Sequence, residues 1–539
     1  MVVIPLMCLI FAVVVGISWS TGGPLDPFEV CIQPPKLLPP DRFRDSSHFF
    51  SPPYRLRSAD LLAGAVRIPT ESFDNMGMDV VDEPRYQPFY TLQKYLINQF
   101  PNAAKYGHLE FVNHLGMLYT FEGQIPADVS PPALLMSHID VVPVNNATRE
   151  QWDYDPFSGY YDGEWLHGRG AADTKNTVVA ILEAVESLLE QGTWKPSRTL
   201  LVGFGFDEEI SGPRGAAHIA KLIEKRYGPD SLYIIVDEGF GHINLEGVRL
   251  ASPLVTERGY LDVEFSIRTD GGHSSLPPDH TAIGIMSELI DRLEDHPFEA
   301  TIADWRTHPV VALMQCVAVN SPFFSQVERS KFLDLDSHAN LVALEQYVND
   351  QGNAIPFMIK TSQAVDIIRG GTKVNALPEE VHAQVNYRVS IDSSTAQVMR
   401  HIVKVAAPVA KEFGFELVVD GETTISGSNG VLHISPGAPL EPAPISPWQG
   451  EQWDLLGGVM RHIFEDYISS PLPLRIAPSM MTGNTDTRHY WNLTKHIYRY
   501  TPVDSADLLN YHTINERIRL HAHLGTVAWY YELILHLTS

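Results

Sequence analysis

Short apolar runs alternate with helical patterns from about residue 56, and this alternation constrains the fold more than any other feature of the chain. Residues 133–137, 199–204 and 232–236 are apolar runs of strand length, and residues 174–191 carry apolar side chains along one helical face. Strands that are apolar throughout are typical of sheets covered on both faces. The sequence therefore predicts an α/β domain with helices on both faces of its sheet.

The pattern changes after about residue 255. Leu261, Val263, Phe265 and Ile267 alternate with polar residues, as in a strand with one wet face. A helical pattern (282–293), a second alternating strand near residues 385–389 and another helical pattern (396–413) follow. We expect a smaller α+β domain inserted into the larger one.

The length of 539 residues also favours two domains. The boundaries that we predict are a Pro-rich arm (21–55), a first catalytic part (56–254), the inserted domain (255–420) and a second catalytic part (421–539). Residues 300–365 are apolar without a clear period, so no element is predicted there. The last helix is expected over residues 514–537.

The N-terminus carries a targeting pattern. An apolar stretch from Val2 to Val15 precedes the small-residue tripeptide at 18–20, which favours a cleaved signal peptide over residues 1–20. A membrane span needs about 20 apolar residues, so a retained anchor is the alternative. Sequons at Asn146 and Asn492 agree with entry into the secretory pathway and with a glycoprotein of the vacuolar lumen or extracellular space.

Cysteine and charge usage exclude two classes of protein. The formal net charge of -26 argues against nucleic-acid binding, which needs clustered Lys and Arg. No CxxC occurs, so a thiolate zinc site is not expected. Cys31 and Cys316 form either a disulfide or two buried thiols, and their spacing leaves both readings open.

Acidic residues and a histidine follow the predicted strands of the larger domain. His138 follows the first apolar run, Glu208 and Glu209 follow the second, and Asp237 follows the third. Asp173 lies at the start of a predicted helix, where an Asp is more often a simple cap. Ligands bind at the carboxyl ends of the strands in open α/β sheets, so their joint placement indicates a site.

Two local patterns suggest the chemistry of that site. Residues two apart on a strand point to the same side, so Asp140 can orient the imidazole of His138, as carboxylates do for metal-bound histidines. The neighbouring Glu208 and Glu209 offer one carboxylate to a metal and one to take a proton from an activated water.

Seven motifs in order resemble a known family. They are HIDVVPV (138–144), GRGAADTKN (168–176), FDEEISGPRGA (206–216), VDEG (236–239), GGHSS (271–275), GGTKVNALP (370–378) and HTINE (512–516). The chain resembles the co-catalytic metallopeptidases of the aminoacylase and carboxypeptidase G family, and most of all its carboxypeptidase S and secreted N-acyl-amino-acid hydrolase branches. The resemblance implies a zinc-peptidase catalytic domain built on a mixed sheet, with the inserted domain as a lid of the dimerisation type.

The resemblance also implies a role for each site residue. His138 and Asp237 would bind one metal, Glu209 and His512 the second, and Asp173 both. Glu208 would be the general base and Asp140 the partner of His138. Two zinc ions are expected, although cobalt or manganese would suit the same ligands.

The lid and a later segment are expected to bind the substrate. The resemblance assigns His273 to the tetrahedral oxyanion, and Asn375 and Arg388 to substrate orientation, with Arg388 on the free carboxylate. Arg488 is a weaker candidate for that carboxylate. In dimeric relatives the lid mediates pairing and can supply its histidine to the neighbouring subunit. A homodimer through the lid is therefore expected, although the additional segment before residue 365 argues against it.

The sequence departs from the family pattern at two places and leaves several functions open. Asn176 stands where many relatives have Gly, and the lid is longer than usual. The leading hypothesis is a di-zinc metallocarboxypeptidase that cuts the amide bond before the C-terminal residue of short peptides. The alternatives are an N-acyl-amino-acid amidohydrolase and, less favoured, a non-catalytic binding relative. An aminopeptidase is disfavoured because Arg388 suits a substrate carboxylate and not an amine.

Overall fold

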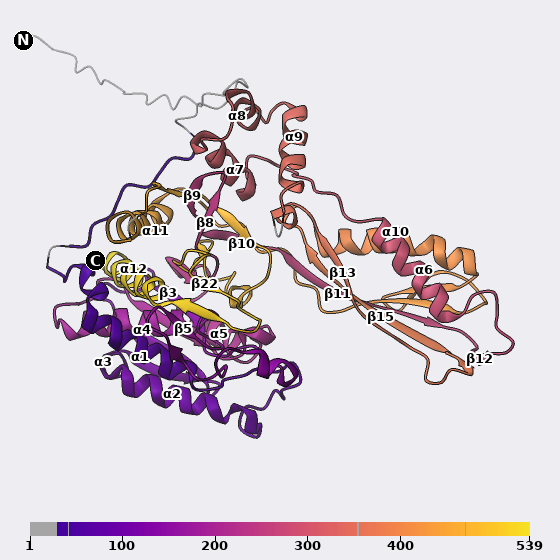
Figure 1. Ribbon diagram of the computed structural model, residues 1–539, viewed down its shortest axis with the longest axis horizontal. Coiled ribbons are helices and arrows are strands. Elements are labelled where there is room, and N and C mark those ends of the chain that lie inside the picture. Colours follow the sequence, from indigo (N-terminus) through magenta and orange to yellow (C-terminus); the bar gives the residue numbers. More distant parts are fainter. Residues whose placement is uncertain (1–29, 41, 353–354, 469) are drawn as a thin grey trace, which may run out of the picture.

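The computed structural model describes residues 30–40, 42–352, 355–468 and 470–539. The predicted signal peptide lies outside these ranges. Figure 1 shows a large body that holds both described ends of the chain, from which an elongated lid extends to one side. Within the described ranges, no helix combines the length and the apolar character that crossing a membrane requires.

A mixed eight-stranded sheet is the centre of the large body. Its strands lie in the order β1-β2-β6-β3-β7-β21-β10-β20. The bounds are β1 His108–Val112, β2 Gly116–Phe121, β3 Ala133–His138, β6 Leu200–Gly205, β7 Ile234–Asp237, β10 Leu254–Glu257, β20 Ser479–Met481 and β21 Ile497–Arg499. β3 pairs in parallel with both β6 and β7, so the ends of these strands meet at one edge. This agrees with the predicted fold class and explains why their C-terminal residues form a site.

Helices cover both faces of this sheet. α1 (Pro52–Val66), α4 (Lys175–Glu190) and α12 (Leu520–Leu537) share one core with residues of one sheet face, and α5 (Ala216–Tyr227) packs on the other face. The remaining helices of the body are α2 (Gln87–Gln99), α3 (Pro101–Tyr106) and α11 (Glu451–His462).

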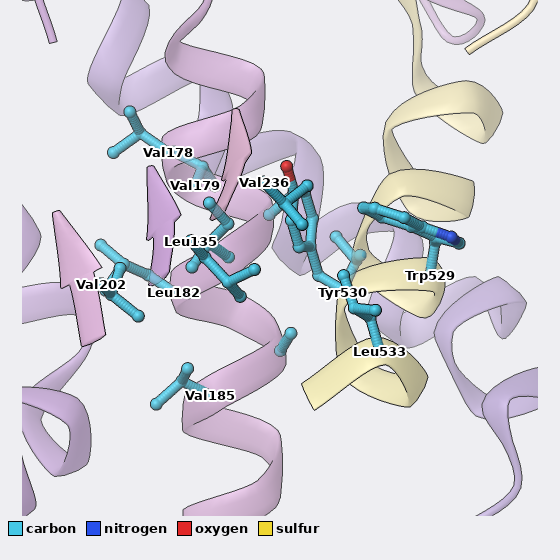
Figure 2. Packing of buried hydrophobic residues seen from close by; sticks show 14 of the residues in the cluster. Leu135, Val178, Val179, Leu182, Val185, Val202, Val236, Trp529, Tyr530 and Leu533 are labelled. Atoms are coloured by element: carbon cyan, nitrogen blue, oxygen red, sulfur yellow. The ribbon is translucent and has the colours of Figure 1, made fainter. Parts of the chain in front are cut away.

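Along each strand, alternate side chains pack into the hydrophobic cores on the two faces of the sheet. Leu135, Val202 and Val236 face α4, whereas their neighbours Leu134, Leu201 and Ile235 pack with α5. Figure 2 shows Leu135, Val202 and Val236 of the strands near Val178, Leu182 and Val185 of α4, with Trp529 and Leu533 of α12 alongside. This packing fixes the strand ends that carry the candidate site.

The start of the last helix differs from the prediction. α12 begins at Leu520, because residues 514–519 form the end of a loop and the short strand β23 (Arg517–Arg519). β23 pairs with β5 (Trp165–His167), in a small sheet that also contains β22 (Leu508–Leu509) and β4 (Tyr160–Tyr161).

The lid consists of a six-stranded sheet with two helices on it. Its strands lie in the order β13-β15-β11-β18-β16-β17. The bounds are β11 Gly259–Arg268, β13 Ser362–Gly370, β15 Glu380–Val389, β16 Glu416–Val419, β17 Glu422–Ile425 and β18 Val431–Pro436, with α6 Ala282–Asp295 and α10 Thr395–Phe413. β12 (Gly272–His273) and β14 (Ala376–Leu377) form a two-stranded tip at the far end of the lid (Figure 1). β17 and β18 follow residue 420, where the predicted lid ended, so we propose a boundary after Pro436.

The segment without a predicted element forms three helices. They are α7 (Pro309–Asn320), α8 (Gln326–Leu333) and α9 (His338–Asn349). α7 is buried on most sides, with Val310, Leu313, Met314 and Val317 nearly inaccessible, so its sequence has no amphipathic period. These helices share a core with Met480 of the large body, and they are not part of the lid sheet.

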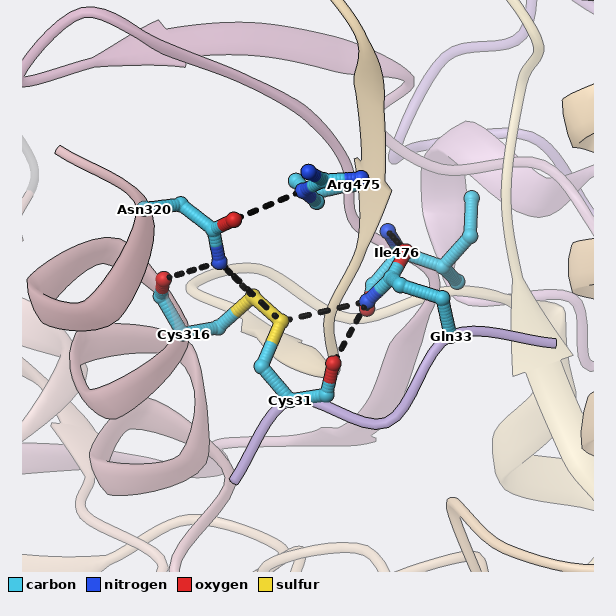
Figure 3. Close-up of a disulfide and its surroundings, with 6 residues drawn as sticks. All are labelled: Cys31, Gln33, Cys316, Asn320, Arg475 and Ile476. Atoms are coloured by element: carbon cyan, nitrogen blue, oxygen red, sulfur yellow. Dashed lines mark hydrogen bonds between the residues drawn. A yellow bond between two sulfur atoms is a disulfide. The ribbon is translucent and has the colours of Figure 1, made fainter. Parts of the chain in front are cut away.

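A disulfide joins the N-terminal arm to α7. Cys31 is bonded to Cys316 across 285 residues of sequence. Gln33 and Asn320 tie the same place to β19 (Leu474–Ile476): the Gln33 Oε1 accepts from the Ile476 backbone N–H at 2.7 Å, and the Asn320 Oδ1 accepts from Arg475 at 2.7 Å (Figure 3). β19 pairs with β9 (Val248–Ala251), which pairs with β8 (His242–Leu245).

Candidate metal centre

Two histidines lie on either side of one carboxylate. The His138 Nε2 is 3.2 Å from the Asp173 Oδ1, and the His512 Nε2 is 3.0 Å from the Asp173 Oδ2. The Glu209 Oε2 lies 3.1 Å from the same nitrogen of His512. Asp173 therefore has one oxygen toward each histidine, as a carboxylate that bridges two cations requires.

The carboxylate beside His138 comes from Glu238 and not from Asp237. The Glu238 Oε1 is 3.1 Å from the His138 Nε2, and these two residues form a potential ligand group with Glu208. Consecutive residues of an extended chain point to opposite sides, so the two acids at the end of β7 cannot both face the site. The expectation for Asp237 is corrected to Glu238.

Asp140 holds the first histidine and the two glutamates together. Its Oδ1 is 3.2 Å from the His138 Nδ1, and it accepts hydrogen bonds from the backbone N–H groups of Glu208 and Glu209 at 3.1 and 3.2 Å. Ser72 donates a further hydrogen bond at 2.6 Å. Asp140 is completely buried beside His138, so we propose that it orients the imidazole.

Glu516 fixes the loop that carries Asp173. Its Oε1 accepts the backbone N–H groups of Gly170, Ala172 and Asp173 at 2.9, 2.9 and 3.1 Å. Its other oxygen binds the Arg169 guanidinium. The sequence analysis did not select Glu516, although it is the last residue of the HTINE motif.

The loop around His512 is held in an unusual backbone conformation. Asn510, His512 and Asn515 all have left-handed φ angles, at 62°, 60° and 59°. Such angles are uncommon outside glycine and are tolerated where the surrounding structure enforces them. His512 is thereby directed at Asp173, which no periodicity of the sequence could indicate.

The acids repel one another in a buried setting. Burial and the neighbouring Asp173 raise the pKa of Glu209 to about 7, and burial raises the pKa of Glu238 to about 7. Burial raises the pKa of Glu208 well above its usual range. Asp173 is an exception: despite burial, hydrogen bonds to His138 and His512 hold its pKa below the usual value.

The donor set fits a pair of divalent cations. Four carboxylates and two imidazoles converge here, and the Glu209 Oε1 is buried without a hydrogen-bond partner among the described residues. Buried like charges are costly unless cations compensate them. The pattern of hard oxygens and imidazole nitrogens therefore fits bound metal.

A cavity of about 640 Å³ opens over this group and is lined by Asp173, Glu208, Glu209, Glu238 and His512. Arg388, Arg488, Asn484 and Tyr260 also line it. The Arg388 Nη1 donates to the Asn484 Oδ1 at 2.9 Å, and its guanidinium carbon lies 4.6 Å from the centre of the Tyr260 ring. Both predicted arginines are therefore at the cavity.

His273 and Asn375 lie elsewhere. They belong to the exposed tip of the lid, where β12 pairs with β14 and the Ser274 N–H donates to the Asn375 carbonyl at 3.4 Å. Neither is among the described residues that line the cavity. The structure does not bring these two residues to the metal group of their own chain, because the extended lid separates them from it (Figure 1).

The fold and the site together define a metal-dependent hydrolase with a lid. Residues 134–536 match the peptidase family M20/M25/M40. The chain is 41% identical to carboxypeptidase S of Saccharomyces cerevisiae over 497 residues, which covers 90% of this chain and 85% of the relative. It is 31% identical to the N-fatty-acyl-amino acid synthase/hydrolase PM20D1 of Mus musculus, covering 90% and 88%.

Solved structures share the fold. Human carnosine dipeptidase 1 aligns with a TM-score of 0.63 at 14% identity, over 93% of this chain and 100% of that one. A metallo-carboxypeptidase of Sulfolobus solfataricus from the M20 family aligns with a TM-score of 0.58 at 15% identity, over 90% and 99%. The chain belongs to the M20/M25/M40 peptidase family, which confirms the resemblance found in its sequence motifs.

Proposed function

We propose that this protein is a di-zinc metallocarboxypeptidase that hydrolyses the amide bond before the C-terminal residue of short peptides. The observation that carries the proposal is the Asp173 carboxylate, with one oxygen toward His138 and the other toward His512. The similarity to carboxypeptidase S supports the peptidase activity. Hydrolysis of N-acyl amino acids is the second candidate, favoured by the similarity to PM20D1.

The ligands are assigned to two positions. His138 and Glu238 would hold one cation, Glu209 and His512 would hold the other, and Asp173 would contribute to both. Imidazole and carboxylate ligands suit zinc, while cobalt and manganese accept the same set. Bound cations would supply Lewis-acid chemistry, which polarises a carbonyl and lowers the pKa of water.

Glu208 is the general base in this mechanism. Its Oε2 lies 3.9 Å from the His138 Nε2, at the edge of the ligand group. Glu208 takes a proton from the attacking water and returns it to the amine that leaves.

Arg388 and Arg488 bind the free carboxylate of the substrate. A guanidinium offers a planar pair of N–H donors to a carboxylate. Asn484 holds Arg388 in place through the hydrogen bond at 2.9 Å. A substrate anchored at this end presents the amide bond next to its carboxylate, which supports a requirement for a free C-terminus.

The lid tip is proposed to act on a partner subunit. Its exposed apolar side chains support pairing: Leu276, Ile283, Ile368 and Val374 are 82%, 40%, 52% and 99% exposed. A partner would pair along β13, which is an edge strand of the lid sheet. The additional segment that forms α7, α8 and α9 shares a core with the large body. In such a homodimer, His273 and Asn375 of one chain would serve the cavity of the other.

We further propose that the protein works in the secretory pathway, in a vacuolar lumen or outside the cell, with residues 1–20 as its signal or anchor. A disulfide at Cys31 and Cys316 is typical of oxidising compartments. The sequon residues Asn146 and Asn492 are both exposed, so glycans could be attached to the folded surface.

Replacing Glu208 by Gln tests the mechanism. We expect kcat on a blocked dipeptide to fall by about 10²–10⁴-fold, the usual contribution of a general base, while two zinc equivalents per chain remain. Glu122→Gln, an exposed position away from the cavity, is the matched control. Unchanged turnover in Glu208→Gln would remove Glu208 from the mechanism, and loss of zinc would make it a ligand.

A further inference from the structure

Two chemically different groups of residues line the cavity over the metal group. One group is polar and contains Arg388, Arg488, Tyr260 and Asn484. The other group is mainly apolar and contains Phe240, Ile243, Val503, Leu508 and Tyr511. Apolar residues in the wall of a ligand cavity indicate that part of the ligand is apolar.

Phe240 and Tyr511 are the aromatic part of that wall. Their ring centres lie 6.3 Å apart at an interplanar angle of 55°. They come from separate loops, one after β7 and one after β22, and 41% of Phe240 and 42% of Tyr511 is exposed. Two large aromatic side chains left open in a cavity wall indicate a binding surface.

Both rings lie beside metal ligands. Phe240 follows Glu238 by two residues, and Tyr511 directly precedes His512, with the ring centres of Tyr511 and His512 6.3 Å apart. Asn510 and His512 flank Tyr511 with left-handed φ angles of 62° and 60°. The backbone conformation that directs His512 at Asp173 therefore also fixes where Tyr511 stands.

We infer that Phe240 and Tyr511 form the subsite for the acyl side of the substrate and select a large apolar group there. The inference rests on the proposed function. With the carboxylate on the arginines and the scissile carbonyl at the metal group, the apolar residues of the same cavity are left for the acyl group. A bulky side chain on the penultimate residue and a fatty-acyl chain share this chemistry.

The test compares substrates that differ only in the acyl group. Acetyl-Leu, benzoyl-Leu, dodecanoyl-Leu and N-blocked Gly-Leu and Phe-Leu share one C-terminal residue. In Phe240→Ala and Tyr511→Ala, kcat/KM should fall roughly tenfold for the apolar acyl groups, because a missing apolar contact is worth this much. The value for acetyl-Leu should stay within about twofold.

Three controls separate the subsite from other effects. Tyr511→Phe keeps the ring, so the preference for apolar over acetyl groups should be retained. Phe323→Ala, at a 70% exposed residue remote from the cavity, should change nothing. The affinity of a non-hydrolysable dodecanoyl-Leu analogue, measured by calorimetry, should fall in Phe240→Ala as kcat/KM does.

The outcomes also separate this inference from the proposed function. An equal loss on every substrate, or none on the apolar ones, would overturn the subsite while leaving the hydrolase intact. A wild-type protein that hydrolyses none of the series would overturn the proposed function itself. A preference for dodecanoyl-Leu over Phe-Leu that disappears in Phe240→Ala identifies a fatty-acyl occupant, and the reverse preference identifies a peptide side chain.

Discussion

Single side chains decide which chemistry this site performs. Asp173 offers one oxygen to each histidine, and Asp140 supports His138 from behind while binding the backbone of Glu208 and Glu209. Metal-binding histidines depend on such carboxylate partners for their orientation. Whether Glu238 or Asp237 at the end of β7 binds the metal therefore tests the ligand assignment.

Separate amide substitutions of Glu238 and Asp237 should have unequal effects on zinc affinity. Glu238→Gln removes a charged ligand, so we expect at least a tenfold loss of affinity for one of the two zinc ions. Asp237→Asn alters a carboxylate directed away from His138 and should retain both. Zinc content after dialysis against a graded chelator, measured by plasma mass spectrometry, checks this. A greater loss of zinc in Asp237→Asn would restore Asp237 as the ligand.

Which site residues the sequence could predict depends on how the fold positions each side chain. His138, Glu208 and Glu209 were predictable because parallel strands end at one sheet edge. The pattern of strand ends indicates Asp237, because the sequence does not reveal that the side chain of the next residue, Glu238, is the one beside His138. His512 depends on a left-handed loop, and only the family motif pointed to it.

At the scale of elements, buried ion pairs connect helices that are far apart in sequence. His462 at the end of α11 lies 2.6 Å from Glu532 of α12, which also accepts a hydrogen bond from Ser46 of the N-terminal arm at 2.5 Å. Burial lowers the pKa of His462, but the hydrogen bond to Glu532 outweighs this effect, and the pKa lies above its usual value of 6.5.

This pair predicts a pH dependence of stability. A histidine whose pKa is raised in the folded state stabilises it fully below the unfolded pKa of about 6.5 and loses this contribution as pH rises through the folded value. Relative to His462→Gln, the wild type should thus lose unfolding free energy as the pH rises above about 6.5. Urea unfolding of both proteins across this range measures it. A difference that is constant or grows with pH would contradict the assigned partner.

Elements were predictable where packing leaves a period in the sequence. α6, α10 and the alternating lid strands have one apolar and one polar side, and they lie within a few residues of their predicted positions. α7 has no such period because it is buried on most sides. The disulfide at Cys31 could not be chosen over two thiols, since only the fold brings Cys316 close.

At the scale of the whole molecule, the lid separates two of the proposed substrate-binding residues from the metal group. His273 and Asn375 lie at the tip, away from the metal group of their own chain, while Arg388 lies at the cavity. In the proposed homodimer, the lid tip of one chain would serve the site of the other. A closed symmetric pair would complete both sites at once.

Mixing two inactive variants tests this arrangement. Glu208→Gln lacks the base and His273→Ala lacks the oxyanion ligand, so each homodimer should be nearly inactive. Half of randomly paired dimers are mixed, and each has one intact site, so co-expression should restore about a quarter of the wild-type sites. Turnover per titrated site, with the mass from light scattering, gives the result. No recovery in a confirmed mixed dimer would place His273 outside the partner's site.

The most direct measurement of the central claim is anomalous diffraction from zinc-loaded crystals, recorded on both sides of the zinc absorption edge. The account predicts two peaks per chain, one contacted by His138, Asp173 and Glu238 and the other by Asp173, Glu209 and His512. A single peak, or two peaks that do not share Asp173, would contradict it.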